Sequence, residues 1–276
     1  MIKVNELKFG YSKKRLLFDN LNLELKKGHI YGLFGVNGAG KTTLLKHLSG
    51  VLMPKEGSVE FNGQSFKERP VSLLQDLYVI PETFSLPPVT VQKFFDIHAP
   101  FYPKMDANKF AHCLKEFDLD ASMKLNQISY GQQKKFIVAF SLATNASLIL
   151  MDEPTNGLDI PSKSQFRKLL AQQIHDDSCI VISTHQVRDL ASLIDYVIVL
   201  DNGTIRFAHE MDEISKKLHF TVKEKADETV LYSEEQFGGI KAICSKETEK
   251  DLETDFELLF NAVISDYEKI NNAFKN

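Results

Sequence analysis

GVNGAGKT at residues 35–42 fits the pattern GxxxxGK[ST] of a phosphate-binding loop, and its residues are Gly35, Val36, Asn37, Gly38, Ala39, Gly40, Lys41 and Thr42. An apolar stretch at residues 30–34 precedes the loop, and leucines at helical spacing follow it, so the loop joins a buried strand to a helix. Glycines allow backbone N–H groups to converge on phosphate oxygens, and the helix N-terminus adds partial positive charge. Lys41 can reach the β- and γ-phosphates, and the Thr42 hydroxyl can ligate Mg²⁺. The stretch therefore predicts nucleotide binding.

Two adjacent carboxylates follow a second apolar stretch. Residues 148–151 read LILM, and Asp152 and Glu153 come directly after them. Open α/β sheets bind ligands at the carboxyl ends of their strands, where Asp152 would hold Mg²⁺ and Glu153 would orient or deprotonate the attacking water. The alternative is a pair of surface acids that cap the loop before Pro154. A phosphate-binding loop in the same chain favours the catalytic interpretation.

Two further polar signals lie at the ends of predicted elements. Ser129 and Gln132 precede an apolar helix and fit a capping box that starts it. A serine hydroxyl and glycine N–H groups at a helix N-terminus also form a phosphate site, and the spacing alone favours neither interpretation. His185 follows a predicted strand at residues 180–183. A single histidine is most often structural, but this place puts it at the same sheet edge as Glu153 and favours a functional role.

Apolar runs and helical periodicities alternate along the chain. Mainly apolar stretches, which are typical of strands buried on both faces, lie at residues 77–80, 148–151, 180–183 and 196–200. Their alternation with helices predicts an α/β fold, in which a P-loop NTPase core is built on a mainly parallel sheet. Alternating apolar and polar residues at 21–25 indicate an antiparallel β region near the N-terminus.

The same patterns divide the chain into parts. We expect a nucleotide-binding domain over residues 1–211, whose core comprises about residues 1–83 and 148–211. Helical periodicity without strands predicts an inserted α-helical subdomain at about residues 84–147. The pattern weakens after residue 211, and short strands with one late helix indicate a small C-terminal appendage at residues 212–276.

The composition excludes several classes of protein. Of 276 residues 43% are hydrophobic and 25% are charged, and a net charge of −4 gives no support to nucleic acid as the main partner. No apolar run reaches the roughly 18 to 20 residues that span a bilayer, and the first residues lack the apolar stretch of a signal peptide. The cysteines fit no zinc or disulfide pattern: Cys113, Cys179 and Cys244. We therefore expect a soluble, cytoplasmic chain that is recruited to a membrane only by a partner.

Four segments occur in the order found in one protein family: GVNGAGKTT, ISYGQQKK, LILMDEPTNGLD and STH. Over about residues 1–210 the sequence resembles the ATP-binding subunits of ABC transporters. In that family the segments are the Walker A motif, the signature motif, the Walker B motif with the D-loop, and the switch histidine. The resemblance implies catalytic roles for Lys41, Glu153 and His185. It also implies that the Walker A residues up to Thr43 contact ATP and that Tyr11 stacks on adenine. Further contacts with ATP are implied for Ser129, Gly131, Gln132 and Asp159.

The sequence departs from the family pattern at two positions. Glu82 stands after Pro81, where the family usually has a glutamine. A carboxylate can reach metal or water but, unless protonated, donates no hydrogen bond, so we assign Glu82 to the Mg²⁺ site with Thr42 and Asp152. Tyr130 replaces the usual glycine of the signature motif. Its side chain must point away from the nucleotide, and we do not count it as a ligand.

The resemblance also implies cofactors and partners. These are ATP, Mg²⁺ and a second copy of the chain, arranged head to tail with each ATP between Walker A of one copy and the signature motif of the other. One cassette without a spanning segment implies a separate permease chain, which would hold this chain on the inner face of the cell membrane. Among the aromatic residues at 84–103 we expect one or two exposed side chains for that contact. The short acidic C-terminal segment resembles single-cassette bacterial export ATPases. The alternative is a soluble ABC-type ATPase that acts as a regulator or switch without a permease.

Overall fold

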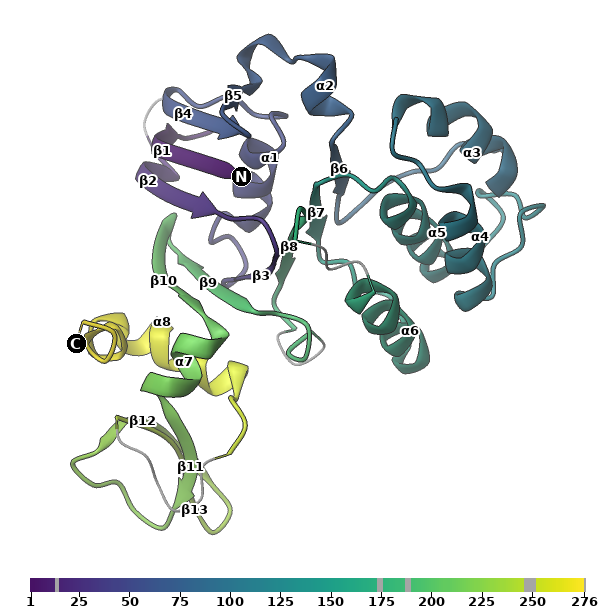
Figure 1. Ribbon diagram of the computed structural model, residues 1–276. Helices are drawn as coiled ribbons and strands as arrows, with labels where there is room; N and C mark the ends of the chain where they lie inside the picture. The colour runs from purple at the N-terminus through teal and green to yellow at the C-terminus, as the bar shows by residue number, and fades with distance from the viewer. Residues whose placement is uncertain (13–14, 173–175, 187–189, 246–251, 276) are drawn as a thin grey trace.

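The centre of the structure is a six-stranded sheet (Figure 1). The structure is a computed structural model and describes residues 1–12, 15–172, 176–186, 190–245 and 252–275. The strand order is β10-β9-β3-β8-β7-β6, in which β10 runs antiparallel to β9 and the other pairs are parallel. The strands are β3 (His29–Phe34), β6 (Leu77–Ile80), β7 (Leu148–Asp152), β8 (Cys179–Thr184), β9 (Tyr196–Asp201) and β10 (Thr204–Glu210). The predicted α/β fold with a mainly parallel sheet is confirmed.

A second sheet lies near the N-terminus and is antiparallel, as the sequence predicts. Its strand order is β2-β1-β4-β5, with β1 (Ile2–Phe9), β2 (Phe18–Leu25), β4 (Glu56–Phe61) and β5 (Gln64–Ser65). Buried residues alternate with exposed ones along most of β2, so one face of the strand packs inward. That face shares a hydrophobic core with the leucines of α1 (Lys41–Leu48). Two short helices then lead to β6, namely η1 (Phe66–Glu68) and α2 (Val71–Leu74).

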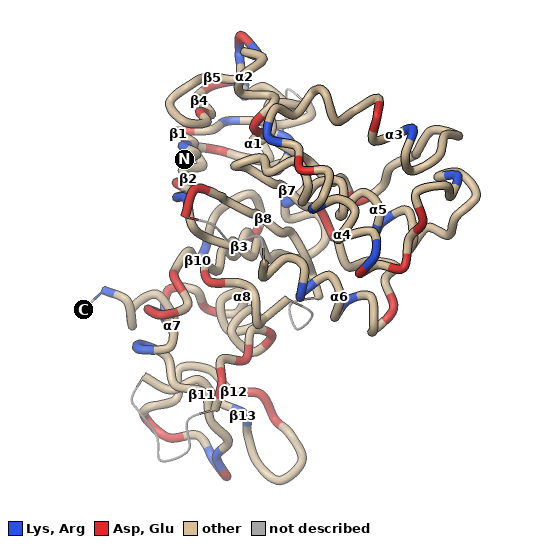
Figure 2. The backbone as a smooth tube through the Cα atoms, turned by 45° about the vertical axis from the view of Figure 1, so that its right-hand side comes forward, with Lys and Arg blue, Asp and Glu red and all other residues tan. Residues whose placement is uncertain are grey.

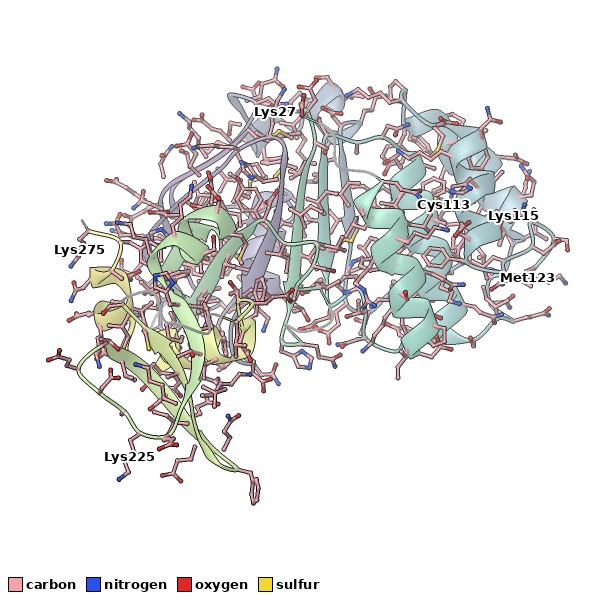
Figure 3. All side chains as sticks on the ribbon, turned by 60° about the horizontal axis from the view of Figure 1, so that its bottom comes forward. Lys27, Cys113, Lys115, Met123, Lys225 and Lys275 are labelled. Atoms are coloured by element: carbon pink, nitrogen blue, oxygen red, sulfur yellow. The ribbon has the colours of Figure 1, made fainter. Side chains whose placement is uncertain are left out.

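Helices replace strands between β6 and β7. Residues 84–147, all of which the structure describes, belong to none of its sheets and contain α3 (Val91–His98), η2 (Ala99–Phe101), α4 (Ala107–Glu116) and α5 (Tyr130–Ala143). Aromatic rings form much of the interior, since the Phe94 centroid lies 5.1 Å from that of Phe136 and 5.3 Å from that of Phe140. In Figure 3, Lys115 and Met123 mark the outer side of this subdomain. After β7, α6 (Ile160–Ala171) packs beside α5.

The C-terminal segment contains a separate small sheet and lies beside the main sheet. It begins with α7 (Met211–Lys217), continues with a three-stranded antiparallel sheet and ends with a long helix, and its remaining elements are β11 (His219–Lys223), β12 (Val230–Gln236), β13 (Gly239–Cys244) and α8 (Phe256–Asn272). Figures 1 and 3 place it at the opposite end of the molecule from α3 and α4. Acidic and basic residues are both spread along its backbone in Figure 2.

The long helix α8 joins this segment to the main sheet. The Phe256 ring packs edge-on against Phe34 of β3, with centroids 6.1 Å apart. At the other end, the Asn271 amide donates a 2.8 Å hydrogen bond to the Arg206 carbonyl of β10. One continuous hydrophobic core therefore includes α8 and the parallel sheet. The proposed domain boundary at residue 212 remains a prediction.

This packing predicts a large loss of stability on replacing Phe256 with alanine. The side chain is 6% exposed, and truncating such a phenylalanine removes buried apolar surface and leaves a cavity. We expect a loss of about 3–5 kcal/mol in the free energy of unfolding, measured by urea denaturation. Phe237→Ala is the matched control, because Phe237 is fully exposed at the hairpin between β12 and β13 and should change stability by less than about 0.5 kcal/mol. Equal losses for the two variants would contradict the packing of α8.

A buried histidine lies in the other core. His47 on α1 is 0% exposed, and its ring meets Phe9 edge-on with centroids 4.5 Å apart. Burial lowers the pKa of His47 from 6.5 to about 4, because the charged imidazolium is poorly solvated there. The fold therefore requires the neutral imidazole.

The shifted pKa predicts a loss of stability in acid. Below pH 6.5 the unfolded chain binds a proton at His47 that the folded chain does not bind until about pH 4. The free energy of unfolding should therefore fall by about 1.4 kcal/mol per pH unit in this window from this group alone. Urea denaturation between pH 7.5 and 5 should show a smaller decline for His47→Leu than for the parent. His112→Leu, which alters an exposed histidine on α4, should retain the parent's decline, and identical curves for all three proteins would refute the prediction.

Candidate functional site

The ends of three parallel strands bring the predicted site together. In the register of the sheet, Phe34 of β3 pairs with Thr184 of β8, and Asp152 of β7 pairs with Ser183 of β8. The loop at residues 35–40, the acidic pair after β7 and His185 after β8 therefore leave the sheet at one edge. This is the carboxyl edge, where the sequence predicts a ligand site.

Backbone geometry explains two glycines of the phosphate-binding loop. Gly40 caps α1 with a φ of 111°, a left-handed conformation that favours glycine. A Cβ on Gly35 would lie only 2.5 Å from the carbonyl oxygen of Leu200, so a larger residue would push the loop away from β9. The loop therefore stays close to the sheet, and the first N–H groups of α1 remain available for an anion.

Lys41 is held inside this loop. Its ammonium donates hydrogen bonds to the carbonyls of Gly35 at 2.7 Å and Val36 at 3.4 Å, and the residue is 8% exposed. Burial lowers the pKa of Lys41. Three carboxylates counteract part of this shift: Glu153, Asp152 and Glu82. The side chain is thus a fixed, poorly solvated cation, which fits a site for a polyanion such as a triphosphate.

Hard oxygen ligands meet beside Lys41. The Thr42 hydroxyl donates a 2.6 Å hydrogen bond to Oδ2 of Asp152, and the Ser183 hydroxyl donates to Oδ1. Asp152 is 4% exposed, and these two hydrogen bonds fix the position of its carboxylate. Mg²⁺ prefers oxygen ligands such as a hydroxyl and a carboxylate, so Thr42 and Asp152 fit the metal. Sequence reasoning did not select Ser183, because a serine inside a buried strand gives no separate signal.

Glu153 and His185 form a direct pair. Oε1 of Glu153 accepts hydrogen bonds from the backbone N–H of His185 at 3.0 Å and lies 2.7 Å from its Nδ1 atom. Oε2 of Glu153 is buried and has no hydrogen-bond partner in the described part of the chain. The residue also has a φ of 47°, which is uncommon outside glycine and often accompanies functional sites. One carboxylate oxygen is therefore anchored, and the other is a buried acceptor without a partner among the described residues.

These groups surround one cavity of about 740 Å³. The predicted residues along its wall are Tyr11, Asn37, Gly38, Gly40, Lys41, Thr42, Thr43, Glu82, Asp152, Glu153 and His185. Tyr11 is 69% exposed, and its hydroxyl shares a 3.1 Å hydrogen bond with Thr43, so its ring stands open beside the phosphate-binding loop. Of the other loop residues, Gly35 and Val36 hold Lys41 through their carbonyls, and Ala39 is buried.

Five residues along the cavity are absent from the sequence prediction: Ser12, Arg15, Leu16, Leu17 and Asn202. Four of them follow Tyr11 in the connection to β2, and the fifth lies in the turn after β9. These positions share no motif with the phosphate-binding loop. The only sequence signal was their nearness to Tyr11 and to the Asn202-Gly203 turn.

The signature residues lie elsewhere on the chain. Ser129 caps α5 and accepts a 3.2 Å hydrogen bond from the Gln132 N–H, while the Gln132 side chain accepts a 2.9 Å bond from the Ser129 N–H. The capping box is therefore present. Neither residue, nor Gly131, lines the cavity of the same chain. Asp159 is also outside it and caps α6 by accepting from the Ser162 N–H at 2.9 Å.

Glu82 and Tyr130, the two residues that depart from the family pattern, contact each other. Glu82 lines the cavity, and its carbonyl accepts a 2.7 Å hydrogen bond from the Tyr130 hydroxyl. The Tyr130 side chain therefore points toward the segment that carries Glu82. Tyr130 is not among the residues along the cavity.

Comparison with known proteins agrees with this geometry. A family model described as ABC transporter matches residues 18–156, about half of the chain, which include the phosphate-binding loop, the signature segment and the acidic pair. The chain belongs to the ABC transporter family. It carries the family's ATP-hydrolysing cassette, with the P-loop fold that the sequence predicts.

Relatives match over most of the chain. The ABC transporter ATP-binding protein YtrB of Bacillus subtilis is 26% identical over 79% of this chain and 74% of its own length. The methionine import ATP-binding protein MetN of Carboxydothermus hydrogenoformans is 34% identical over 74% of this chain and 65% of its own. A dimeric ATP-binding cassette, solved in a post-hydrolysis state with ADP and Pi, is 26% identical with a TM-score of 0.66, over 76% of this chain and 98% of that one. Among the described residues, no helix combines the length and apolar character needed to cross a bilayer.

Proposed function

We propose that this chain is the ATP-binding and ATP-hydrolysing subunit of an ABC transporter, and that two copies drive a separate membrane permease. The observation that carries the proposal is the convergence of Lys41, the Thr42–Asp152 pair and the Glu153–His185 pair around one cavity. A fixed cation, hard oxygen ligands and an anchored carboxylate are the parts that phosphoryl transfer to water requires.

Nucleotide binding would use the phosphate-binding loop and Tyr11. The first N–H groups of α1 and the Lys41 ammonium would bind the phosphates, and the exposed Tyr11 ring would stack on the base. Thr42, Asp152 and Glu82 would hold Mg²⁺, which neutralises charge on the β- and γ-phosphates when bound. The ADP and Pi found in the related dimeric cassette support an adenine nucleotide as the ligand.

Hydrolysis would depend on Glu153. With Oε1 anchored by His185, the Glu153 carboxylate, which lines the cavity, can accept a hydrogen bond from the attacking water and then its proton. His185 would keep the carboxylate oriented. It would also lie beside the γ-phosphate, because it lines the same cavity.

The signature residues support a head-to-tail dimer. Ser129, Gly131 and Gln132 stand at the N-terminus of α5, outside the cavity of their own chain. A second copy could place this helix N-terminus, with its partial positive charge, against the γ-phosphate in the first. Asp159 would lie at the same interface. The dimeric structures of a related cassette support the formation of a dimer.

The permease would be a separate chain at the inner face of the membrane. Phe101 is 63% exposed at the end of η2, in agreement with our expectation of an exposed aromatic residue in this region. We propose export, because the short C-terminal segment resembles single-cassette export ATPases. One relative is a methionine import protein, so the direction of transport needs a test of its own.

Two measurements test the function. Purified chain should release phosphate from ATP in a Mg²⁺-dependent reaction, and a tagged chain isolated from its native cells in mild detergent should carry a polytopic membrane protein with it. Phosphate release without any membrane protein would favour the soluble regulator instead. Absence of Mg²⁺-dependent hydrolysis from the isolated complex would refute the proposal.

A further inference from the structure

The main chain at Glu82 is held against α5, the helix that begins at the signature residues, by two hydrogen bonds to one oxygen atom. The Glu82 carbonyl accepts from the Tyr130 hydroxyl at 2.7 Å and from the Lys134 ammonium at 3.1 Å. Both donors belong to the first turns of α5. A carbonyl oxygen has two lone pairs, so this one has its full complement of hydrogen bonds.

The Tyr130 ring contacts two further segments. It stacks on Phe84, with centroids 5.6 Å apart and planes 22° from parallel. A Cβ on Gly157, in the loop after β7, would lie 3.2 Å from Cδ1 of the ring, so the ring rests directly on that glycine. One side chain thus joins the Glu82 segment, the start of α5 and the loop that follows the acidic pair.

Lys134 completes the link from inside the protein. Its side chain is fully buried, and its ammonium lies 5.8 Å from the Phe84 centroid and 5.6 Å from the Tyr130 centroid. Burial lowers the pKa of Lys134, and the carboxylates that counteract this shift are those of the nucleotide site: Glu82, Asp152 and Glu153. A buried charge of this kind is costly unless it is paired. Here a backbone carbonyl and two aromatic faces pair it.

We propose that Tyr130 and Lys134 are positioning residues that fix the main chain at Glu82 and thereby direct the Glu82 carboxylate into the nucleotide cavity. The inference rests on the proposed role of Glu82 at the Mg²⁺ site. Glu82 is exposed and belongs to a connection between β6 and α3, so its own side chain does little to fix its backbone. Hydrogen bonds and packing from α5 supply the support that a functional carboxylate needs.

The first test removes each donor separately. Tyr130→Phe keeps the ring on Phe84 and Gly157 but loses the hydroxyl, and Lys134→Met keeps the stem but loses the charge. We expect kcat to fall about three- to tenfold for Tyr130→Phe and further for Lys134→Met, while ATP affinity changes less than about twofold. Tyr232→Phe is the matched control, since it removes a hydroxyl that donates a 3.1 Å bond to Glu234 in the C-terminal segment.

The second test asks whether these residues act through Glu82. In a Glu82→Ala background, Tyr130→Phe should lower kcat no further, whereas independent, additive losses would overturn the inference. Mn²⁺ binding to the Glu153→Gln variant with ATP, followed by electron paramagnetic resonance, gives a readout without turnover. Tyr130→Phe should weaken it as Glu82→Ala does, and unchanged Mn²⁺ affinity would also overturn the inference. If the parent chain hydrolyses no ATP, only the proposed function is refuted. The Mn²⁺ measurement needs no turnover and still decides the role of Tyr130.

Discussion

Replacing Glu153 with glutamine is expected to lower the rate of ATP hydrolysis by about 10²- to 10⁴-fold, the usual contribution of a general base. Glutamine has nearly the same shape and can still meet the backbone N–H of His185 through its amide oxygen. It cannot accept a proton from water. Because the substitution removes the base and leaves the phosphate-binding loop unchanged, the loss should fall on the chemical step.

The same variant should trap ATP in a dimer. Lys41, Thr42 and Ser129 are unchanged in it, so ATP would still bind and bridge two copies. Gel filtration with and without ATP, combined with a phosphate-release assay, should show an ATP-dependent dimer with almost no turnover. Glu68→Gln alters an exposed glutamate on η1 and should behave like the parent. Hydrolysis by Glu153→Gln near the parent rate would remove Glu153 from the catalytic role.

Much of the fold was predictable because several strands of the parallel sheet are mainly apolar. The run at 77–80 is β6 itself, and the run at 180–183 lies within β8 (Cys179–Thr184). Strands buried on both faces are mostly apolar, so their approximate limits are visible in the sequence. The phosphate-binding loop and the acidic pair were likewise visible, since the chemistry of each resides in consecutive residues.

Contacts between distant segments could not be predicted. The late apolar helix needed a surface to bury it, but nothing in its sequence indicated that Phe256 would meet Phe34. Likewise, the hydrogen bond from Tyr130 to Glu82 joins residues 48 positions apart, and no sequence pattern connected the two. The helical spacing of Val187, Leu190, Ala191 and Ile194 also predicts a helix, but residues 187–189 lie outside the described residues and residues 190–193 form turns. Such contacts depend on the three-dimensional arrangement rather than on a local pattern.

Replacing Lys41 with alanine should weaken ATP binding, whereas Glu153→Gln should impair only the chemical step. The ammonium now donates to loop carbonyls and would exchange these partners for phosphate oxygens. A hydrogen bond to a charged group contributes about 1.5–3 kcal/mol, so ATP affinity should fall roughly 10- to 150-fold for each phosphate bond lost. The loop itself should persist, since its glycine conformations do not depend on the lysine.

The consequence for assembly separates binding from chemistry. Without Lys41, ATP should no longer reach the occupancy needed to bridge two copies, so gel filtration with ATP should show monomer and the phosphate assay should show no turnover. Lys46→Ala is the control, because it removes the same charge from an exposed position on the same helix. An ATP-dependent dimer in the Lys41→Ala variant would mean that the signature residues of the second copy hold the nucleotide without the phosphate-binding lysine. The cation fixed at 2.7 Å from the Gly35 carbonyl would then serve the loop and not the ligand.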